Sequence, residues 1–314
     1  MVDVGGGGHL KVSLEAVRGT YTAATVTVPI ESESLQEVRT DSWRSPLLGR
    51  AVTQGKVGGR AGVEGTIVME ALPYPMVYFL AASRWGNNIA EGGIGPWTYT
   101  ATDDAAAHVK QTLRSLSIGI DRAGVGFAYL GCQVTRMRFF FDDGIPKVEY
   151  SIMGLEETTD YTPTSPTDPT EVPFGADETV VKVAASQRVD LDSLEITFDD
   201  NGEIKYNLSG QEAADYVKYG EFIGDASFEI DFESKADYAL WKARTVQELI
   251  MTCTVDADQI LDIEMHGGVY DTFEVGLTGL GDQVRASAGL RAVYATADTA
   301  AAQIVLTTAV QVIV

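Results

Sequence analysis

The feature that most constrains the fold is a two-residue alternation of apolar and polar side chains that recurs along the chain. In SFEIDFE three apolar residues alternate with Glu229, Asp231 and Glu233, and in LDIEM three alternate with Asp262 and Glu264. Successive side chains of a β-strand point to opposite faces, so each segment has one core face and one acidic face. If the two strands are neighbours, these carboxylates form one acidic sheet face; a solvated outer face is the alternative explanation.

Glycine-containing turns separate the alternating segments, and the composition agrees with this pattern. The chain of 314 residues has 32 glycines and 10 prolines, and 45% of its residues are hydrophobic. Abundant Val, Thr and Ala between glycine turns favour strands, and the ordinary hydrophobic content argues against disorder. The sequence therefore predicts an all-β protein.

Two segments resemble each other and predict hairpins. They are FDDGIPKVEYSIMG at 141–154 and FDDNGEIKYNLSG at 198–210. In each, two aspartates are followed by Gly144 or by Asn201 and Gly202, which adopt the positive φ that a tight turn needs. In the second hairpin we expect the strand that ends at Phe198 to face the strand that follows the turn.

The order of expected elements is similar on both sides of a Pro- and Thr-rich stretch near the middle of the chain. Each half has a strand, a long loop, a second strand, one helix and several further strands. We predict an N-terminal arm at 1–24, a first β domain at 25–158, a linker at 159–178 and a second β domain at 179–314. Duplication of a β domain explains the similarity, and shared turn chemistry is the alternative.

The long loop and the helices can be placed on this outline. The first loop is polar and contains glycine, and it runs from Gln36 to Gly59. The helices are expected in PYPMVYFLAAS, whose apolar residues fit one helical face, and in SKADYALWKAR. Each predicted domain therefore has one short helix.

The chain is strongly acidic, with a net charge of −22. Most of the excess lies in the second half, where residues 159–314 carry 28 acidic and 9 basic side chains. Tight binding of DNA or RNA relies on Lys and Arg that neutralise phosphates, so this composition argues against it. Solubility, adaptation to a salty environment and a specific use of the charge all remain open.

No catalytic or metal-binding pattern stands out. His9, His108 and His266 do not have the spacing of metal ligands, and neither Cys132 nor Cys253 has a histidine or second cysteine nearby. Two free thiols within strands are favoured over one disulfide. We therefore expect no catalytic residues, no metal, no cofactor and no enzymatic activity.

Two short patterns that resemble ligand sites are explained by turns. The segment GVGFAYLG at 124–131 lies between strands instead of before a helix, and its spacing does not fit a dinucleotide loop. The acidic run DDNG at 199–202 lacks the alternate acids of a calcium loop. Neither segment indicates a cofactor.

No segment predicts insertion into a membrane. The most apolar helical candidate, Ala71 to Ala82, is shorter than the roughly 20 residues that span a bilayer and contains two prolines. The first residues, MVDVGGGGHL, lack the basic start and apolar run of a signal peptide. We expect a soluble protein made in a cytoplasm.

Three stretches of the chain resemble the major tail tube proteins of long-tailed, siphovirus-type bacteriophages. The first runs from TVPIESESLQEVRTDSW through GRAVTQGKVGGRAGVEGTIVME to ALPYPMVYFLAAS, and the others are DLDSLEITFDDNGEIKYNLSG and GEFIGDASFEIDFESKADYALWKA. The shared features are the ESESL strand, its long loop, the second strand with its apolar helix, and the SLEITFDDN and SFEIDFE segments with the helix that follows. The resemblance extends from Thr25 to Tyr294.

This resemblance implies a structural virion protein with two tandem tail-tube-type β-sandwich or barrel domains. Such proteins assemble into stacked rings that form a tube around a tape measure protein and meet terminator and distal tail proteins at the ends. Double-stranded DNA would pass through the tube without specific binding. A chain with two domains favours a trimeric ring with pseudo-hexameric symmetry, and a plain hexamer is the alternative. The protein would be made in the host cytoplasm and located in the virion tail, without contact to a membrane.

Two sets of residues follow from this interpretation as candidate sites. An acidic wall would repel DNA and leave a gap comparable to the Debye length of about 8 Å. The candidates for the lumen are the five acidic residues of the two alternating strands, Glu229, Asp231, Glu233, Asp262 and Glu264. The candidates for contacts between rings or subunits lie in the first long loop, and they are Trp43, Arg44, Leu47, Leu48 and Arg50.

Two other classes of function are weighed against the tube. One is an adhesin or virion decoration module that binds carbohydrate on exposed aromatic residues, although the four tryptophans are scattered in the sequence. The other is a secreted hydrolase of β architecture, which the missing catalytic residues and signal peptide disfavour. Rings or tubes in the electron microscope would separate the conduit from a monomeric glycan binder.

Overall fold

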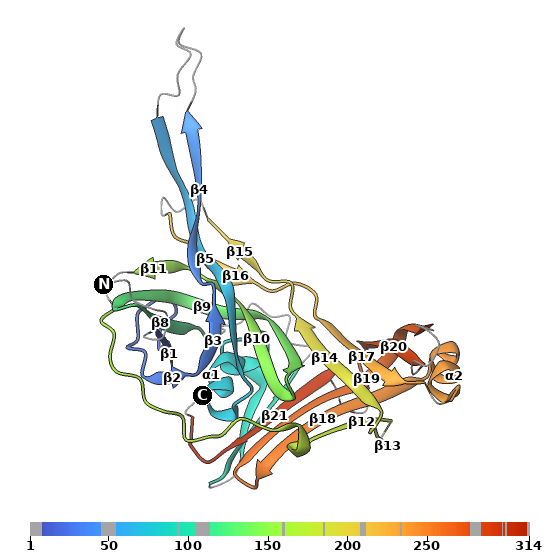
Figure 1. Ribbon diagram of the computed structural model, residues 1–314. Coiled ribbons are helices and arrows are strands. Elements are labelled where there is room, and N and C mark those ends of the chain that lie inside the picture. The colour runs from blue at the N-terminus through green and yellow to red at the C-terminus, as the bar shows by residue number, and fades with distance from the viewer. Residues whose placement is uncertain are drawn as a thin grey trace.

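The structure is a computed structural model of the whole chain, and its main feature is one long, strongly bent antiparallel sheet (Figure 1). The structure describes residues 8–44, 55–92, 95–103, 114–158, 161–184, 186–207, 212–232, 234–276, 284–296, 298 and 300–312. Within these residues the fold is all-β with two short helices, which confirms the predicted fold class.

The centre of the molecule is a sheet that runs through both halves of the chain. We call it the central sheet, and its strand order is β4-β5-β10-β9-β14-β17-β20-β19. Its strands are β4 (Gln36–Arg44), β5 (Gly55–Glu70), β10 (Ile145–Gly154), β9 (Val125–Asp142), β14 (Leu191–Asp199), β17 (Ile223–Asp231), β20 (Arg285–Ala292) and β19 (Gln259–Gly276). Strand β3 (Ile30–Glu33) continues the line of β4 and also pairs with β5.

Two long strands connect the central sheet to the other layers. Strands β9 and β19 each have 18 residues, and the N-terminal half of each lies in a different layer from its C-terminal half. One layer contains β1 (His9–Leu14), β2 (Val26–Val28), β8 (Leu116–Arg122) and β11 (Glu156–Thr158). The other contains β12 (Thr179–Val183), β13 (Ser186–Gln187), β18 (Val246–Asp256), β21 (Ala302–Thr308), β7 (Trp97–Thr102) and β6 (Ile89–Gly92).

The remaining elements are short. A small hairpin of β15 (Glu203–Lys205) and β16 (Tyr216–Lys218) forms a separate two-stranded sheet. The helices are α1 (Pro73–Ala81) and α2 (Ala236–Ala243), with single 3₁₀ turns at η2 (Arg84–Asn88) and η3 (Ala176–Glu178). Both helices lie in the segments where the sequence predicts them.

The strand pairings of the first half recur in the second half in the same chain order. In the first half these pairings are β1–β8, β8–β9, β9–β10, β10–β5 and β5–β4, with α1 after β5. In the second half they are β12–β18, β18–β19, β19–β20, β20–β17 and β17–β14, with α2 after β17. Strands β6, β7 and β21 lie outside this common order. We call the two sets the first unit and the second unit.

Irregularities in the ladders also recur at matching places. The β3–β5 pairing is interrupted between Ile30 and Ser32, and the β14–β17 pairing between Leu191 and Ser193, which are 161 residues further along. The hairpin β9–β10 has a bulge beside Ser151, and β19–β20 has one at the equivalent place. Bulges bend a strand at a fixed point, so their coincidence gives the two units the same local curvature.

The first of the two predicted hairpins is confirmed and the second is wrong. Strands β9 and β10 are joined by Asp143 and Gly144, whose φ angles are 49° and 80°, as a tight turn requires. After Asp199, however, the chain does not return along β14, because β14 pairs with β9 and β17. The turn residue Asp200 is 2% exposed beside Arg84, so this stretch is fixed in the interior instead of forming a surface turn.

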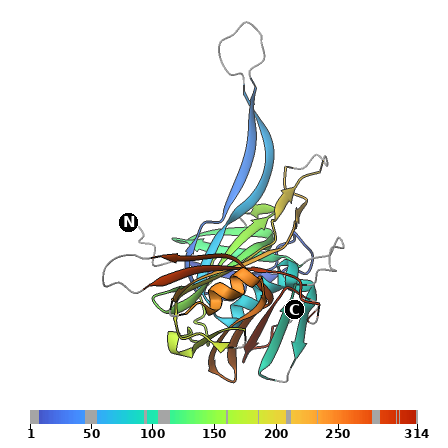
Figure 2. The same ribbon diagram turned by 90° about the vertical axis from the view of Figure 1, so that its right-hand side faces the viewer.

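The predicted long loop from Gln36 to Gly59 is also wrong at both of its ends. Strand β4 occupies 36–44 and β5 begins at Gly55, so these residues form a ribbon that projects from the body (Figures 1 and 2). A projecting ribbon has water on both faces, so its sequence lacks the apolar alternation that marks a strand over a core.

The N-terminal and linker segments both make specific contacts. Strand β1 lies within the stretch predicted as an arm, and its Leu10 and Val12 are fully buried between β2 and β8. The linker at 159–178 is irregular, and it crosses the molecule: Thr167 donates from its amide to Thr27 Oγ1 and Val172 to Gln259 Oε1. The linker therefore contacts the body of the molecule, and contacts continue across the boundary predicted between the two domains.

Candidate functional site

The first and second units meet in a strand pairing that we call the internal seam. Strand β9 pairs with β14 from Phe140 opposite Glu195 to Arg136 opposite Asp199. On the core side of this seam Phe139 lies opposite Ile196, and both are almost completely buried. The seam therefore joins the two units by backbone ladder and apolar packing together.

The seam also carries an ion-pair bridge on its other face. Arg138 of β9 donates to Glu195 of β14 at 2.7 Å and lies 3.7 Å from Glu149 of β10. The Arg138 guanidinium lowers the pKa of the Glu195 carboxyl, chiefly through this hydrogen bond. One arginine thus links three adjacent strands across the boundary between the units.

A buried charge cluster fixes the two units together at one end of the seam. Arg84 of η2 lies 3.7 Å from Asp103 and 3.8 Å from Asp200, and all three side chains are buried. Burial raises the pKa of Asp200 to about 8, although Arg84 opposes this change and Asp103 adds to it. Burial is the main cause of this rise, so the site favours the protonated form of Asp200 over its carboxylate.

The central sheet has two open edges in the described part of the chain. At one edge β4 pairs only with β5, and at the other the C-terminal half of β19 pairs only with β20. Open edges present unpaired backbone groups and favour pairing with another strand. These edges lie at opposite ends of the strand order, so they can join one molecule to two neighbours.

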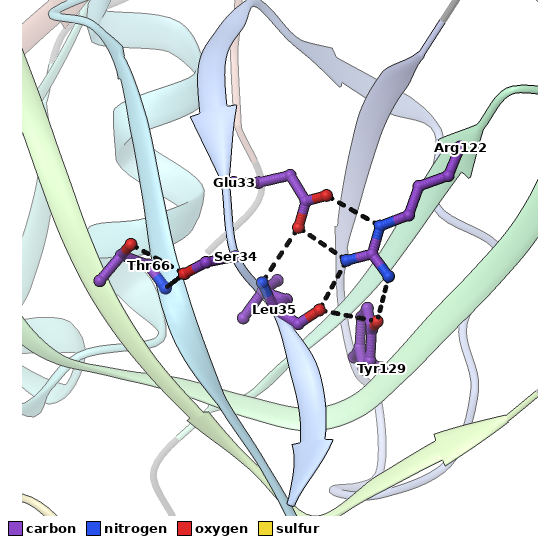
Figure 3. A network of polar contacts seen from close by, with 6 residues as sticks. All are labelled: Glu33, Ser34, Leu35, Thr66, Arg122 and Tyr129. Atoms are coloured by element: carbon purple, nitrogen blue, oxygen red, sulfur yellow. Dashed lines mark hydrogen bonds and ion pairs between the residues drawn. The ribbon is translucent and has the colours of Figure 1, made fainter. Parts of the chain in front are cut away.

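A polar network holds the bend between β3 and β4 at the first open edge (Figure 3). Arg122 donates to both oxygens of Glu33 at 2.8 Å and to the Leu35 carbonyl, which also accepts from Tyr129. Glu33 in turn accepts from the Leu35 amide at 3.0 Å. Glu33 raises the pKa of Arg122, which is therefore charged at any accessible pH. We call this network the Arg122 clamp.

The face of the central sheet opposite the core is charged, and we call it the charged face. Its acidic residues include Glu64, Glu149, Glu195, Asp225, Glu229, Asp231 and Glu274. Three arginines on this face have carboxylate partners: Arg138 as described, Arg285 with Asp192 and Glu229, and Arg291 with Asp225 at 3.9 Å. These arginines are thus engaged with protein carboxylates, which reduces their attraction for a phosphate.

The candidate acidic residues do not form one surface, because their two strands are not neighbours. Glu229 and Asp231 lie on the charged face in β17, between β14 and β20. Asp262 and Glu264 lie in the N-terminal half of β19, between β18 and β21 in another layer. The reason is the length of β19, since only its C-terminal half reaches the central sheet; Glu233 lies outside the described residues.

Asp262 and Glu264 are also less solvated than a surface pair. They are half-buried, and burial raises the pKa of both carboxyls. At Glu264 the neighbouring Asp262 adds to the rise in pKa, and His266 partly offsets it. Asp262 accepts from Thr252 Oγ1 at 2.9 Å. These two residues belong to a local polar contact between strands.

The residues predicted to form contacts in the first loop are described only in part. Trp43 and Arg44 end strand β4 instead of lying in a loop, and the Trp43 side chain is 70% exposed. Leu47, Leu48 and Arg50 lie outside the described residues. An indole with this exposure near the end of a projecting ribbon is available for contact with another molecule.

Other chemistry is sparse in the residues that the structure describes. No group of three or more His, Cys, Asp or Glu side chains there could hold a metal ion. Cys132 and Cys253 are free and buried, as the sequence favoured, and burial raises the pKa of Cys253 to about 11. In the described chain no helix has the length and apolar character to cross a bilayer.

The tryptophans do not gather on one surface. Trp85 is fully buried against Phe198 and Phe222, and Trp97 and Trp241 are only partly exposed. Trp43 stands on the ribbon, away from the others in the sequence. The described tryptophans thus supply no shared stacking platform of the kind that a sugar-binding site uses.

Comparison with known families gives one clear result. A family model described as "Phage tail tube protein" matches residues 5–261, which is most of the chain. No curated protein matches the sequence.

Proposed function

The chain belongs to the phage tail tube protein family, and from this premise we propose that it forms the wall of a tail tube as rings of three copies. The protein acts as a structural component of the virion tail and has no catalytic role. The observation that carries this proposal is the pair of matching units, joined at one internal seam and open at both outer edges.

The ring follows from repeating the internal seam between molecules. If the open edge of the second unit pairs with the open edge of the first unit in the next copy, each junction resembles the one inside the chain. Closed rings remove the edges that would otherwise aggregate. Three copies of a two-unit chain give six similar units, and a ring of six copies is the alternative.

The charged face supports an inner wall that lets DNA pass. The opposite face of the central sheet is covered by the core and the other layers. On the charged face, the small β15–β16 hairpin lies against β5 at Gly62, and no other sheet of the described chain covers the part formed by β14, β17 and β20. DNA carries one negative charge per about 1.7 Å of its axis, so an acidic wall in which Arg138, Arg285 and Arg291 are paired with carboxylates repels it weakly. We keep Glu229 and Asp231 as lumen candidates and assign Asp262 and Glu264 to another layer.

The projecting ribbon is the candidate for contacts between rings. The ribbon projects beyond the body of the molecule (Figure 1), and Trp43 of β4 is 70% exposed, so this aromatic side chain can enter a neighbouring surface. We propose that the tape measure protein occupies the lumen during assembly and that terminator and distal tail proteins bind the two ends. Synthesis takes place in the host cytoplasm before incorporation into the tail.

Electron microscopy of the purified chain tests this function. At raised protein concentration we expect rings, or striated tubes of stacked rings, with threefold symmetry in cross-section. A chain that stays monomeric at every concentration, and binds glycans in an array, would favour the adhesin or decoration module instead. A sixfold cross-section would retain the tube and replace the trimer by the hexamer.

A further inference from the structure

The internal seam can be used as a template for the contact between two copies, because the two units match residue by residue. Along β3, β4 and β5, residue numbers increase by 161 to reach β14 and β17, and the two ladder irregularities coincide under this shift. Along the C-terminal part of β9, the numbers increase by 136 to reach β19, as the pairings with β10 and β20 require.

Applying both shifts to the seam gives a unique register. In the seam Arg138 lies opposite Thr197, and Phe139 lies opposite Ile196. Arg138 corresponds to Glu274 and Thr197 to Gln36. We propose, on the basis of the proposed ring, that Thr272–Gly276 of one copy pairs antiparallel with Ser34–Val38 of the next, with Glu274 opposite Gln36 and Val275 opposite Leu35.

The exposure of one side chain supports this register independently. Phe139 in the internal seam is 2% exposed, whereas Val275 at the matching position of β19 is 42% exposed. Phe139 is covered by the adjoining unit, whereas Val275 pairs with Ala286 of β20 on one side and has no strand of the described chain on its other side. The proposed neighbour places the strand around Leu35, whose own side chain is already buried, beside Val275 and covers it. The two units do not correspond at every pair: at the next position along the strand, the first unit has Glu37 where the internal seam has the apolar Phe198.

The backbone at the first edge has the orientation that this pairing needs. The Ser34 amide donates to the Thr66 carbonyl of β5, so the backbone groups of Leu35 point to the open side. These groups are the ones held by the Arg122 clamp (Figure 3). The clamp therefore occupies the position of the incoming strand in the single chain, and it releases the Leu35 backbone when Val275 binds.

Such a clamp is a form of edge protection. An unpaired strand edge invites association with any other strand, and side chains that occupy its backbone groups limit this risk. At the internal seam no such protection is needed, because Ile196 of β14 is already paired with Phe139. The clamp thus protects the edge that pairs with another copy, whereas the matching edge at β14 is already paired within the chain.

Disulfide trapping in assembled particles tests the register. Gln36 and Glu274 are both exposed, and as a non-hydrogen-bonded pair their Cα atoms would lie about 4.5 Å apart, within disulfide range. We expect the double variant Gln36→Cys/Glu274→Cys to form covalent oligomers under mild oxidation, ending at a covalent trimer. The matched control, Gln36→Cys/Thr272→Cys, shifts one partner by two residues on the same face and should give little product. The native cysteines are buried and stay silent.

The outcomes separate this proposal from the proposed function. Particles that form without cross-links at 36–274, or that cross-link better in the shifted control, overturn the register and leave the tube intact. Absence of particles in the wild-type chain overturns the tube, and the register with it. If the cysteine variants do not assemble, hydrogen exchange on the wild type decides: assembly must slow exchange at 35–38 and 272–276, and unchanged exchange in both segments refutes the proposal.

Discussion

The two units of the chain share their strand order but differ in how much of each is covered by protein. Helix α1 of the first unit is buried nearly all round, with Phe79 stacked on Tyr150 at a ring separation of 4.4 Å. Helix α2 of the second unit has no buried residue. The strand edges differ in the same way, since Phe139 is covered and Val275 is exposed.

This difference teaches that the first unit is completed within the molecule and the second is not. Elements of the second unit and its extension, β19 and β21, contact α1 and close the first unit. Among the described residues, helix α2 is packed mainly against β19 of its own unit. The incomplete surroundings of α2 and β19 are therefore what a ring of such chains would complete with the next copy.

The largest expected effect contrasts the two helices. Phe79→Ala removes a fully buried ring and should lower the free energy of unfolding by about 3–5 kcal/mol. Leu240→Ala in the half-buried α2 is the matched change, and it should cost about 1 kcal/mol or less. Urea unfolding of the unassembled chain measures both. Equal losses in the two helices would show that the units are equally complete and would break the comparison.

A second contrast concerns pH at matching positions of the two units. Burial raises the pKa of Asp200 to about 8, whereas the pKa of an aspartate in the unfolded chain is about 3.9. Between these values the folded chain binds more protons than the unfolded chain, so stability falls as pH rises from about 4 to 8. Asp200→Asn should remove this part of the pH dependence and raise stability most at pH 8.

The control for this prediction is Arg39, which is 161 residues before Asp200 and exposed. Arg39→Gln should leave the slope of stability against pH unchanged between pH 5 and 8. Urea unfolding at several pH values measures the slopes. An Asp200→Asn chain whose slope equals that of the wild type would mean that Asp200 is ionised in the folded state.

The smallest expected change in stability comes from a substitution in the Arg122 clamp. Arg122 is partly exposed, so Arg122→Gln should lower the free energy of unfolding by only about 1 kcal/mol. It also removes one of the two donors to the Leu35 carbonyl, and light scattering should therefore report faster assembly than in the wild type. Lys218→Gln, at an exposed position away from the clamp, serves as control. Slower assembly of Arg122→Gln than of the control would show that the clamp supports the contact.

Strands over the core could be predicted from the sequence because their side chains alternate between core and solvent. The segments around Phe228 and Leu261 are examples, and both helices and the Asp143–Gly144 turn were also placed correctly. The ribbon of β4 and β5 was missed because water surrounds both of its faces, which removes the alternation. A local sequence pattern therefore identifies a strand only where one face of that strand packs on the core.

Relations between distant residues could not be predicted in the same way. The burial of Asp200 depends on Arg84, more than one hundred residues away, and nothing in DDNG indicates it. The separation of Glu229 from Asp262 depends on the bend of β19 between two layers. The Arg122 clamp similarly joins three strands. The repeat of the two units could have located the open edges if the strand order within each unit had been known.

The most direct test of the central claim is the mass of the smallest closed particle, measured by native mass spectrometry on assembled and gently dissociated material. The account predicts a ring of three 33.7-kDa chains, since three copies supply six similar units and leave no open edge. A species that remains a single chain at every concentration, or oligomers that grow without closing at a fixed number, would contradict it.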